Sequence, residues 1–235
     1  MKNQEPTVVF DQKMASSYDE RWAKLAPTRD ALHLLIRLIL SDLPADARIL
    51  CVGVGTGSEL IYLAEAFTAW HFTAVDPATA MLDICRQRAE ASGIASRCTF
   101  HDGYLDSLPA TDSFDAATCL LVSQFILQRE ERREFFREIA SRLRIGGYLI
   151  NADITSDTST PAFQGLLAVW LQMMRYTGVP EESLAKIPAT LGRDVTVLPR
   201  HEIEAIIAAG GFEPPVLFSQ SLLIHSWYSR RMATD

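Results

Sequence analysis

The stretch Arg48-Ile49-Leu50-Cys51-Val52-Gly53-Val54-Gly55-Thr56-Gly57-Ser58-Glu59-Leu60 decides the fold of this chain. Four apolar residues, 49–52, predict a short buried strand, three alternating glycines follow, and Ser58 to Phe67 predict a helix. Glycine permits positive φ and lets a ligand approach the backbone without a Cβ in the way. The first turn of the helix directs free N–H groups and its positive dipole end toward the same place. The stretch therefore predicts a nucleotide or nucleoside site at the carboxyl end of a parallel strand.

Asp76 supports this interpretation. A second predicted strand, His71 to Val75, ends at Asp76, about 20 residues beyond the glycines, where an acid can accept hydrogen bonds from ribose hydroxyls. The glycines are spaced G-x-G-x-G, so Ser58 stands where the dinucleotide fingerprint G-x-G-x-x-G has its last glycine. The alternative is an ordinary tight turn before a helix that Asp76 caps. The position of the acid favours a ligand site.

The glycine stretch resembles the nucleoside-binding loop of class I S-adenosylmethionine-dependent methyltransferases. Three further stretches match that family in the right order: Ala74-Val75-Asp76-Pro77, His101-Asp102-Gly103 and Leu143-Arg144-Ile145-Gly146-Gly147-Tyr148. The resemblance covers roughly residues 30–153. It implies S-adenosyl-L-methionine as the cofactor, with the following binding residues: Gly53, Gly55, Gly57, Asp76, Pro77, Asp102, Gly103, Val122 and Tyr18. Cys51 is a departure, because the family has Asp or Glu there to help hold the methionine portion.

Two further strand ends are expected to contribute polar groups. In the family, the residue after the third strand often binds the adenine amino group, and the Asp102 carboxylate can accept from such a donor. The alternative is that Asp102-Gly103 is only a turn. The methyl donor and acceptor meet after the fourth strand in the family, so Ser123 and Gln124 are expected to contact the acceptor. Equally, these two residues could cap the next helix.

The chain as a whole predicts a single α/β domain over residues 1–235, with a doubly wound, mostly parallel, seven-stranded sheet. The resemblance adds that the last two strands form a hairpin, which leaves one antiparallel strand. A helix from Thr28 to Leu43 is predicted from an apolar stripe of Leu32, Leu35, Ile36, Ile39 and Leu43. The helix from Arg129 to Leu143 mixes arginines with glutamates, which predicts a solvated, salt-bridged face. The remaining predicted elements are a helix to about Ser92 after Pro77, strands Cys98–His101, Phe114–Leu121, Tyr148–Asp153, Val216–Phe218 and Leu222–Tyr228, and a helix His201–Ala209.

The amino-acid composition indicates which partners and which cellular compartment to expect for this protein. The formal net charge of −7 argues against a broad basic surface for nucleic acid. Four cysteines stand far apart without a C-x-x-C pair, so neither disulfides nor a zinc site is expected, and no other cluster has metal-ligand spacing. The N-terminus has no apolar signal core, and no apolar run is long enough to span a bilayer. A soluble cytoplasmic protein without a membrane partner is expected.

Two segments lie outside the repeating strand–helix pattern. Residues 1–27 place Tyr18 and Trp22 on one helical face, and this segment is expected to close over the cofactor or to pack on the core. Residues 155–199 interrupt the pattern with a predicted helix from Ala162 to Tyr176. This helical insertion is expected to be a lid over the acceptor, with Trp170 and Tyr176 as contacts. Packing on the sheet or a homodimer contact is the alternative.

The leading functional hypothesis is therefore a methyltransferase that acts on a small-molecule acceptor by direct in-line transfer from S-adenosyl-L-methionine. No general base is assigned. The insertion and the C-terminal hairpin also look similar to carboxy-S-adenosylmethionine synthase, a tRNA-modification enzyme, which makes that activity the first alternative. In that enzyme an arginine of the insertion reads the added carboxylate, whereas Pro188 stands at the corresponding place here. A nicotinamide-dependent dehydrogenase and a non-catalytic cofactor-binding module are further alternatives.

Overall fold

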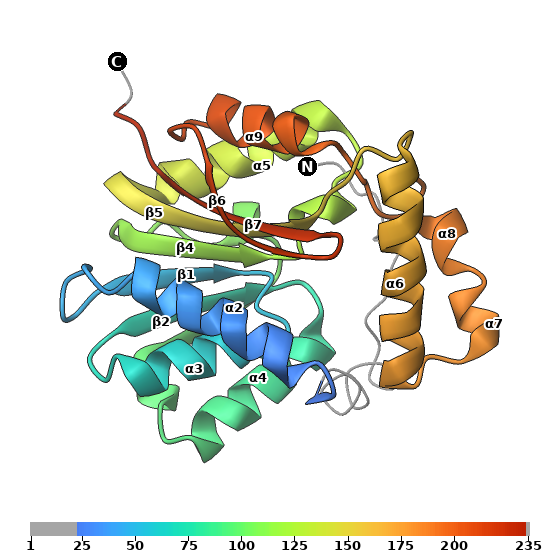
Figure 1. Ribbon diagram of the computed structural model, residues 1–235. Coiled ribbons are helices and arrows are strands. Elements are labelled where there is room, and N and C mark those ends of the chain that lie inside the picture. The colour runs from blue at the N-terminus through green and yellow to red at the C-terminus, as the bar shows by residue number, and fades with distance from the viewer. Residues whose placement is uncertain (1–22, 234–235) are drawn as a thin grey trace.

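Seven strands form one sheet in the order β3-β2-β1-β4-β5-β7-β6 (Figure 1). The computed structural model describes residues 23–233. Its strands are β1 Arg48–Val52, β2 His71–Asp76, β3 Cys98–Asp102, β4 Phe114–Leu120, β5 Leu143–Ile154, β6 Val216–Ser221 and β7 Ile224–Arg230. Neighbouring strands from β3 to β5 are parallel, whereas β7 is antiparallel to both β5 and β6. The predicted doubly wound sheet with one antiparallel strand is confirmed.

Helices cover both faces of the sheet because its central strands are apolar on both sides. Ile49 and Cys51 pack in one hydrophobic cluster, and the alternate residues Leu50 and Val52 pack in the other. The first face carries α2 Ala26–Ile39, α3 Ser58–Ala66 and α4 Thr79–Ala91, and the second carries α5 Arg129–Arg142 and α9 Arg200–Ala209. Three short 3-10 turns follow α4, β3 and β4: η1 Ala95–Arg97, η2 Leu105–Ser107 and η3 Ser123–Phe125.

The predicted apolar stripe of α2 is only partly correct. Ile36 is fully buried as expected, but the helix ends at Ile39, and Leu35 is 36% exposed. His33 is buried instead, and its ring centroid lies 5.4 Å from that of Tyr62 on α3. Burial and the nearby Arg29 guanidinium lower the pKa of His33 to about 4. A neutral imidazole therefore packs like an aromatic residue in this interface, which hydrophobic periodicity alone does not predict.

The insertion forms a separate layer beyond the carboxyl ends of the parallel strands (Figure 1). It contains α6 Pro161–Thr177, α7 Glu181–Leu184 and α8 Ile187–Thr190. The Thr160 hydroxyl caps α6 by accepting the Phe163 N–H at 3.3 Å, and Gly178 ends the helix at φ 95°. One face of α6 packs in a third hydrophobic cluster, which also includes Leu184 and the Leu223 side chain from the β6–β7 turn. The predicted helix is thus present, and its apolar face is covered mainly by its own insertion.

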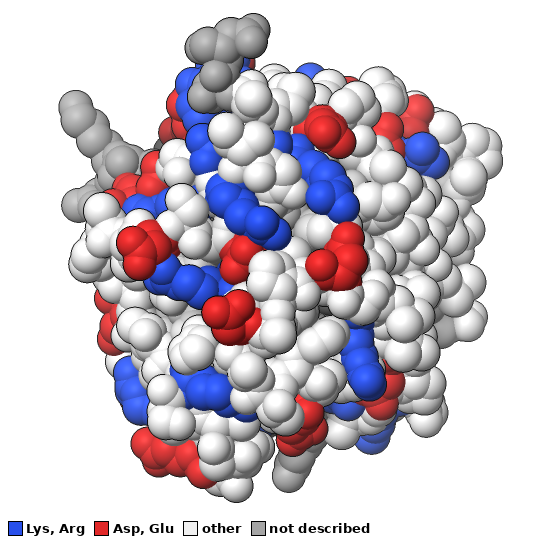
Figure 2. All heavy atoms as spheres, turned by 90° about the vertical axis from the view of Figure 1, so that its left-hand side faces the viewer, with Lys and Arg blue, Asp and Glu red and all other residues white. Residues whose placement is uncertain are grey.

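The opposite end of the molecule, where the parallel strands begin, has a mixed surface. Figure 2 shows lysine and arginine side chains interspersed with aspartate and glutamate on this face. Two ion pairs at the strand starts are of this kind: Arg48 with Asp112 at 3.1 Å, and Arg144 with Asp115 at 2.8 Å. No helix in the described part of the chain is both long and apolar enough to span a bilayer.

A buried charge network below η3 corrects the interpretation of α5 as a purely solvated helix face. Arg132 is 1% exposed, because it lies four residues before Phe136 on the inward stripe of the helix. Its Nη2 lies 2.8 Å from Asp153 Oδ1, and its Nε donates to Ser123 Oγ at 2.9 Å. Ser123 Oγ in turn donates to Asp153 Oδ2 at 2.6 Å. The network joins α5, β5 and η3 inside the protein.

Arg132→Met should lower the free energy of unfolding by about 3–5 kcal/mol, because it leaves the Asp153 carboxylate buried without its counter-charge. Arg137→Met is the matched control, since Arg137 on the same helix makes a half-exposed pair with Glu134. That control should lose about 1 kcal/mol or less. Urea unfolding of both variants measures the difference, and equal losses would show that the buried network contributes nothing special.

Candidate functional site

The glycine loop brings the ends of β1, β2 and β4 together. Gly53 N and Val54 N both donate to Val75 O of β2, at 2.8 and 3.1 Å. At Gly57 the backbone φ is +80°, and a Cβ there would lie 2.4 Å from Cys85 Sγ of α4. Only glycine therefore allows α3 and α4 to pack this closely. Among the described residues, the nearest neighbour of a Cβ added at Gly55 would be Met81 Cε, at 3.7 Å, so the described part of the protein leaves this side of the loop open.

Asp76 organises this loop from the neighbouring strand. Its Oδ2 accepts the Gly55 N–H and its Oδ1 accepts the Ala78 N–H, both at 2.8 Å. Its backbone carbonyl accepts the Gly103 N–H at 3.1 Å, so one residue connects three loops. The side chain is buried, and burial raises the pKa of Asp76 although the Ala78 and Gly55 N–H groups oppose that shift. Each carboxylate oxygen keeps a further lone pair that can accept a hydrogen bond from a ribose hydroxyl. The ribose contact of Asp76 stays a prediction.

The third strand end lies directly beside Asp76. Asp102 is its register partner across the β2–β3 pair and is exposed, with both carboxylate oxygens accepting from Thr79 Oγ1 at 3.0 and 3.2 Å. Pro77 is also exposed next to it. Asp76, Pro77, Asp102 and Gly103 thus meet at one edge of the sheet with the glycine loop. The predicted adenine contact of Asp102 is compatible with this position and stays a prediction.

The end of β4 completes this edge, but the predicted acceptor contacts of Ser123 and Gln124 need correction. Val122 packs against Gly53, where a Cβ would come within 2.4 Å of Val122 Cγ2. Ser123 and Gln124 were expected to contact the acceptor or to cap a helix, but both side chains are buried, at 0% and 4% exposure. Ser123 belongs to the Arg132–Asp153 network, and Gln124 Oε1 accepts the Ile154 N–H at 3.1 Å. Their polar groups are used inside the protein, so neither faces an acceptor in this structure.

The two aromatic residues predicted on the insertion point in opposite directions. Trp170 is 7% exposed and lies within the hydrophobic cluster of α6. Tyr176 is 66% exposed, and only its backbone carbonyl has a described partner, the Lys24 ammonium at 3.4 Å. Trp170 is therefore part of the core of the insertion rather than a surface contact. Tyr18, the remaining predicted cofactor contact, lies outside the described residues.

Glu59 and Leu121 were not predicted from the sequence. Glu59 is buried in the first turn of α3, where its Oε1 accepts from Thr118 Oγ1 of β4 at 3.1 Å. The sequence signal for it is an acid in the first turn of a largely apolar helix. Leu121 has φ 61° directly after β4, and in the described part only Leu222 shares positive φ among residues other than glycine. Such backbone strain often occurs at functional sites, but the sequence of Leu121 carries no sign of it.

Cys51 behaves as a buried apolar residue. It is fully buried, and burial together with the charge of Glu59 raises the pKa of its thiol well above the usual value. A thiol of this kind carries little thiolate near neutral pH, so it is poorly suited to act as a nucleophile. This agrees with the departure at position 51 being a change in the binding site rather than a new catalytic group.

Comparison with known proteins agrees with this geometry. Residues 49–147, from β1 to the start of β5, match the family model described as a methyltransferase domain. This part of the chain is similar to a methyltransferase domain. An S-adenosylmethionine-dependent methyltransferase from Methanosarcina mazei shares the fold with a TM-score of 0.62 at 16% identity, over 84% of this chain and 98% of that one.

The curated relatives match only part of this chain, and the matches cover only part of each relative. Carboxy-S-adenosyl-L-methionine synthase of Campylobacter lari is 32% identical over 145 residues, which is 61% of this chain and 60% of that enzyme. Fatty-acid O-methyltransferase of Mycolicibacterium smegmatis is 30% identical over 121 residues, or 52% of this chain and 42% of that enzyme. The chain thus spans about 60% or less of the length of these relatives.

The family implies S-adenosyl-L-methionine as the cofactor, and the residues present fit it. The open side of Gly55 lets a ligand approach the backbone, and the N-cap residue of α3, Gly57, has no side chain to cap the first N–H groups of the helix. Asp76 and Asp102 supply carboxylate acceptors at adjacent strand ends, suited to ribose hydroxyls and an amino group. The methyltransferase domain therefore holds the donor set that a charged nucleoside requires.

Gly55→Ala should weaken cofactor binding about tenfold or more, because the added methyl group occupies the open side of the loop. The protein has room for it, so stability should fall by only about 1–2 kcal/mol, the cost of a left-handed alanine. Calorimetric titration with S-adenosyl-L-methionine measures the affinity.

Gly165→Ala on α6 is the matched control. No side chain or other segment of the described residues lies within 4 Å of a Cβ there, and the residue is helical, so stability should rise by about 0.5–1 kcal/mol with unchanged binding. Full affinity in a folded Gly55→Ala variant would remove the loop from the cofactor site.

Proposed function

We propose that this protein is an S-adenosyl-L-methionine-dependent methyltransferase that transfers the methyl group in line to a small molecule with an apolar portion. The observation that carries the proposal is the single edge of the sheet where the glycine loop, Asp76, Asp102 and the insertion meet. Bound there, the cofactor supplies an already activated methyl group. The chain's own residues then have to bind the cofactor and the acceptor, orient them toward each other, and exclude water from the site.

The insertion is suited to close the acceptor side of this edge. Thr196 N donates to Gln124 O of η3 at 2.8 Å, and Ser156 N donates to Leu198 O at 3.1 Å. Both ends of the insertion are thereby held beside the end of β4, two residues from Val122. The layer formed by α6, α7 and α8 stands across the carboxyl ends of the strands (Figure 1). This arrangement supports a lid that screens the reacting methyl group from water.

The net charge of the chain and the name of one similar protein support a small-molecule acceptor. The net charge of −7 argues against a broad basic surface for a nucleic acid, and the face in Figure 2 carries charges of both signs. The fatty-acid O-methyltransferase among the relatives is named for an apolar small acceptor. We extend the proposal to a reducing, cytoplasmic compartment, because all four cysteines are free.

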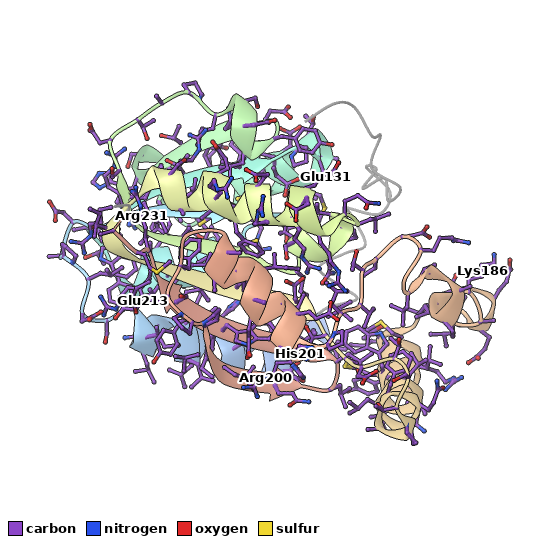
Figure 3. The ribbon with its side chains drawn as sticks, turned by 90° about the horizontal axis from the view of Figure 1, so that it is seen from above. Glu131, Lys186, Arg200, His201, Glu213 and Arg231 are labelled. Atoms are coloured by element: carbon purple, nitrogen blue, oxygen red, sulfur yellow. The ribbon has the colours of Figure 1, made fainter. Side chains whose placement is uncertain are left out.

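The second candidate is synthesis of carboxy-S-adenosyl-L-methionine, which the 32% identity to the Campylobacter lari enzyme favours. An added carboxylate would require a cation from the insertion, where position 188 is proline. The three basic residues of the insertion each pair with an acid within it: Arg175 with Glu181, Lys186 with Glu182, and Arg193 with Asp194. Lys186 also lies at the outer end of the insertion (Figure 3). Plain methyl transfer therefore fits the described residues better.

Mass spectrometry of small molecules that copurify with the native protein separates the two candidates. We expect S-adenosyl-L-methionine or its demethylated product, and transfer of an isotope-labelled methyl group to members of a panel of apolar alcohols, phenols and carboxylic acids. Recovery of a carboxylated cofactor would establish the second candidate. Cofactor binding with no transfer to any small acceptor, but with labelling of tRNA, would contradict the proposed acceptor class.

Trp170→Ala tests the lid. Removing this side chain from the insertion core should cost about 3–5 kcal/mol locally and raise the acceptor KM, while cofactor affinity stays within about twofold. Val169→Ala is the matched control, because Val169 is 46% exposed on the outer face of the same helix. Kinetics with an acceptor from the panel and sedimentation measure both effects. Normal acceptor kinetics with loss of a dimer would make the insertion an assembly element instead.

A further inference from the structure

Glu59 is a buried acid between α3 and the ends of β1 and β4. Its side chain is 8% exposed, although acids on helices normally face solvent. Thr118 Oγ1 donates to it at 3.1 Å, and the nearby Cys51 thiol and the backbone N–H groups of Glu59 and Leu60 favour its charged form. All of these groups are neutral. The carboxylate therefore lies at the start of α3, next to the glycine loop, with a hydrogen bond but without a counter-charge from these groups.

The described residues provide no cation for this carboxylate. Within residues 23–233 no ion pair joins Glu59 to a basic side chain. The titratable groups that interact with it are the Cys51 thiol of β1, the Cys85 thiol of α4 and the Cys119 thiol of β4, and burial raises the pKa of all three. Arg88 of α4 donates instead to Thr56 O at 3.2 Å. A buried unpaired carboxylate is costly, and burial raises the pKa of Glu59 to about 7.

We infer that Glu59 is the counter-charge for the cationic cofactor and holds its ammonium end at the glycine loop. This inference rests on the proposed function. S-adenosyl-L-methionine carries two positive centres, an ammonium and a sulfonium, and a single carboxylate. The sulfonium has to stay accessible to the acceptor, whereas a nearly buried carboxylate such as Glu59 can only pair with a group that becomes buried too. The ammonium is that group.

Glu59→Gln tests this inference in the full chain, with Glu65→Gln as the matched control. Glu65 is an exposed acid on the same helix, so both variants lose one negative charge from α3. Calorimetry with S-adenosyl-L-methionine and with S-adenosylhomocysteine, which keeps the ammonium but lacks the sulfonium charge, measures binding. Glu59→Gln should weaken both ligands about tenfold to a hundredfold, whereas Glu65→Gln should stay within about twofold.

The pH dependence of binding gives a second measurement on the unaltered protein. A cation binds the ionised form of Glu59, so its affinity should rise from pH 6 to pH 8 and binding should release a proton. The Cys51, Cys85 and Cys119 thiols stay neutral in this range, because burial raises the pKa of each. Titration of Asp76 and of the ligand's amine affects the original protein and the Glu59→Gln variant alike. The part of the pH dependence that disappears in Glu59→Gln therefore belongs to Glu59. Heats measured in buffers of different ionisation enthalpy report the proton.

The stability of the ligand-free protein separates a binding role from a structural one. The pKa of Glu59 is about 7 in the folded protein, above its value of 4.5 in the unfolded chain. As the pH rises from about 4.5 through about 7, the ionisation of Glu59 therefore lowers the free energy of unfolding. Glu59→Gln removes this penalty, and its urea midpoint at pH 8 should be higher than that of the original protein.

Three results would overturn the inference. They are unchanged affinity in Glu59→Gln, a lower urea midpoint at pH 8, and, should the variant fail to fold, a flat pH dependence without proton release in the original protein. Failure of the original protein to bind either ligand would instead reject the proposed function itself.

Discussion

The edge of the sheet that forms the site depends on the buried carboxylate of Asp76. Its two oxygens accept N–H groups from the glycine loop and from the start of α4, and its carbonyl accepts the Gly103 N–H. Three loops after three different strands are therefore positioned by one residue. Hydrogen bonds between a charged acceptor and backbone N–H groups are stronger than neutral ones, and here they are shielded from water. The loops can thus be rigid before a ligand arrives.

Two acids near the glycine loop, Asp76 and Glu59, are buried at a cost to the free protein. Burial raises the pKa of both, which means that their charged forms are less stable here than in water. Asp76 recovers part of this cost through backbone N–H donors. Within the described part of the chain, Glu59 accepts a hydrogen bond from the neutral Thr118 hydroxyl and has no cation, and it lies beside a site whose expected ligand is positively charged. A site of this kind is less stable than an apolar one but is already organised for a cation.

The insertion adds a second layer, which we propose covers the acceptor, without changing the central sheet. Its apolar face packs on its own short helices and on the β6–β7 turn, and backbone hydrogen bonds connect it to η3. The network of Arg132, Ser123 and Asp153 supports η3 from the other side. The end of β4 is therefore held between a buried ion pair and the insertion. A loop fixed from both sides can orient an acceptor, whereas a free loop could not.

The sequence by itself determined the sheet, the glycine loop and the residues at the strand ends, because these follow from local patterns. An apolar run, a glycine spacing or an acid after a strand can each be recognised within a few residues of sequence. Only the tertiary structure decided which polar side chains face inward. Ser123, Gln124 and Trp170 were predicted at the site but are buried, and Arg132 and Glu59 were overlooked although they are buried charges. Their environments are set by partners that are 9 to 59 residues away, such as Arg132 for Ser123 and Thr118 for Glu59. Such long-range contacts leave no periodic signal in the chain.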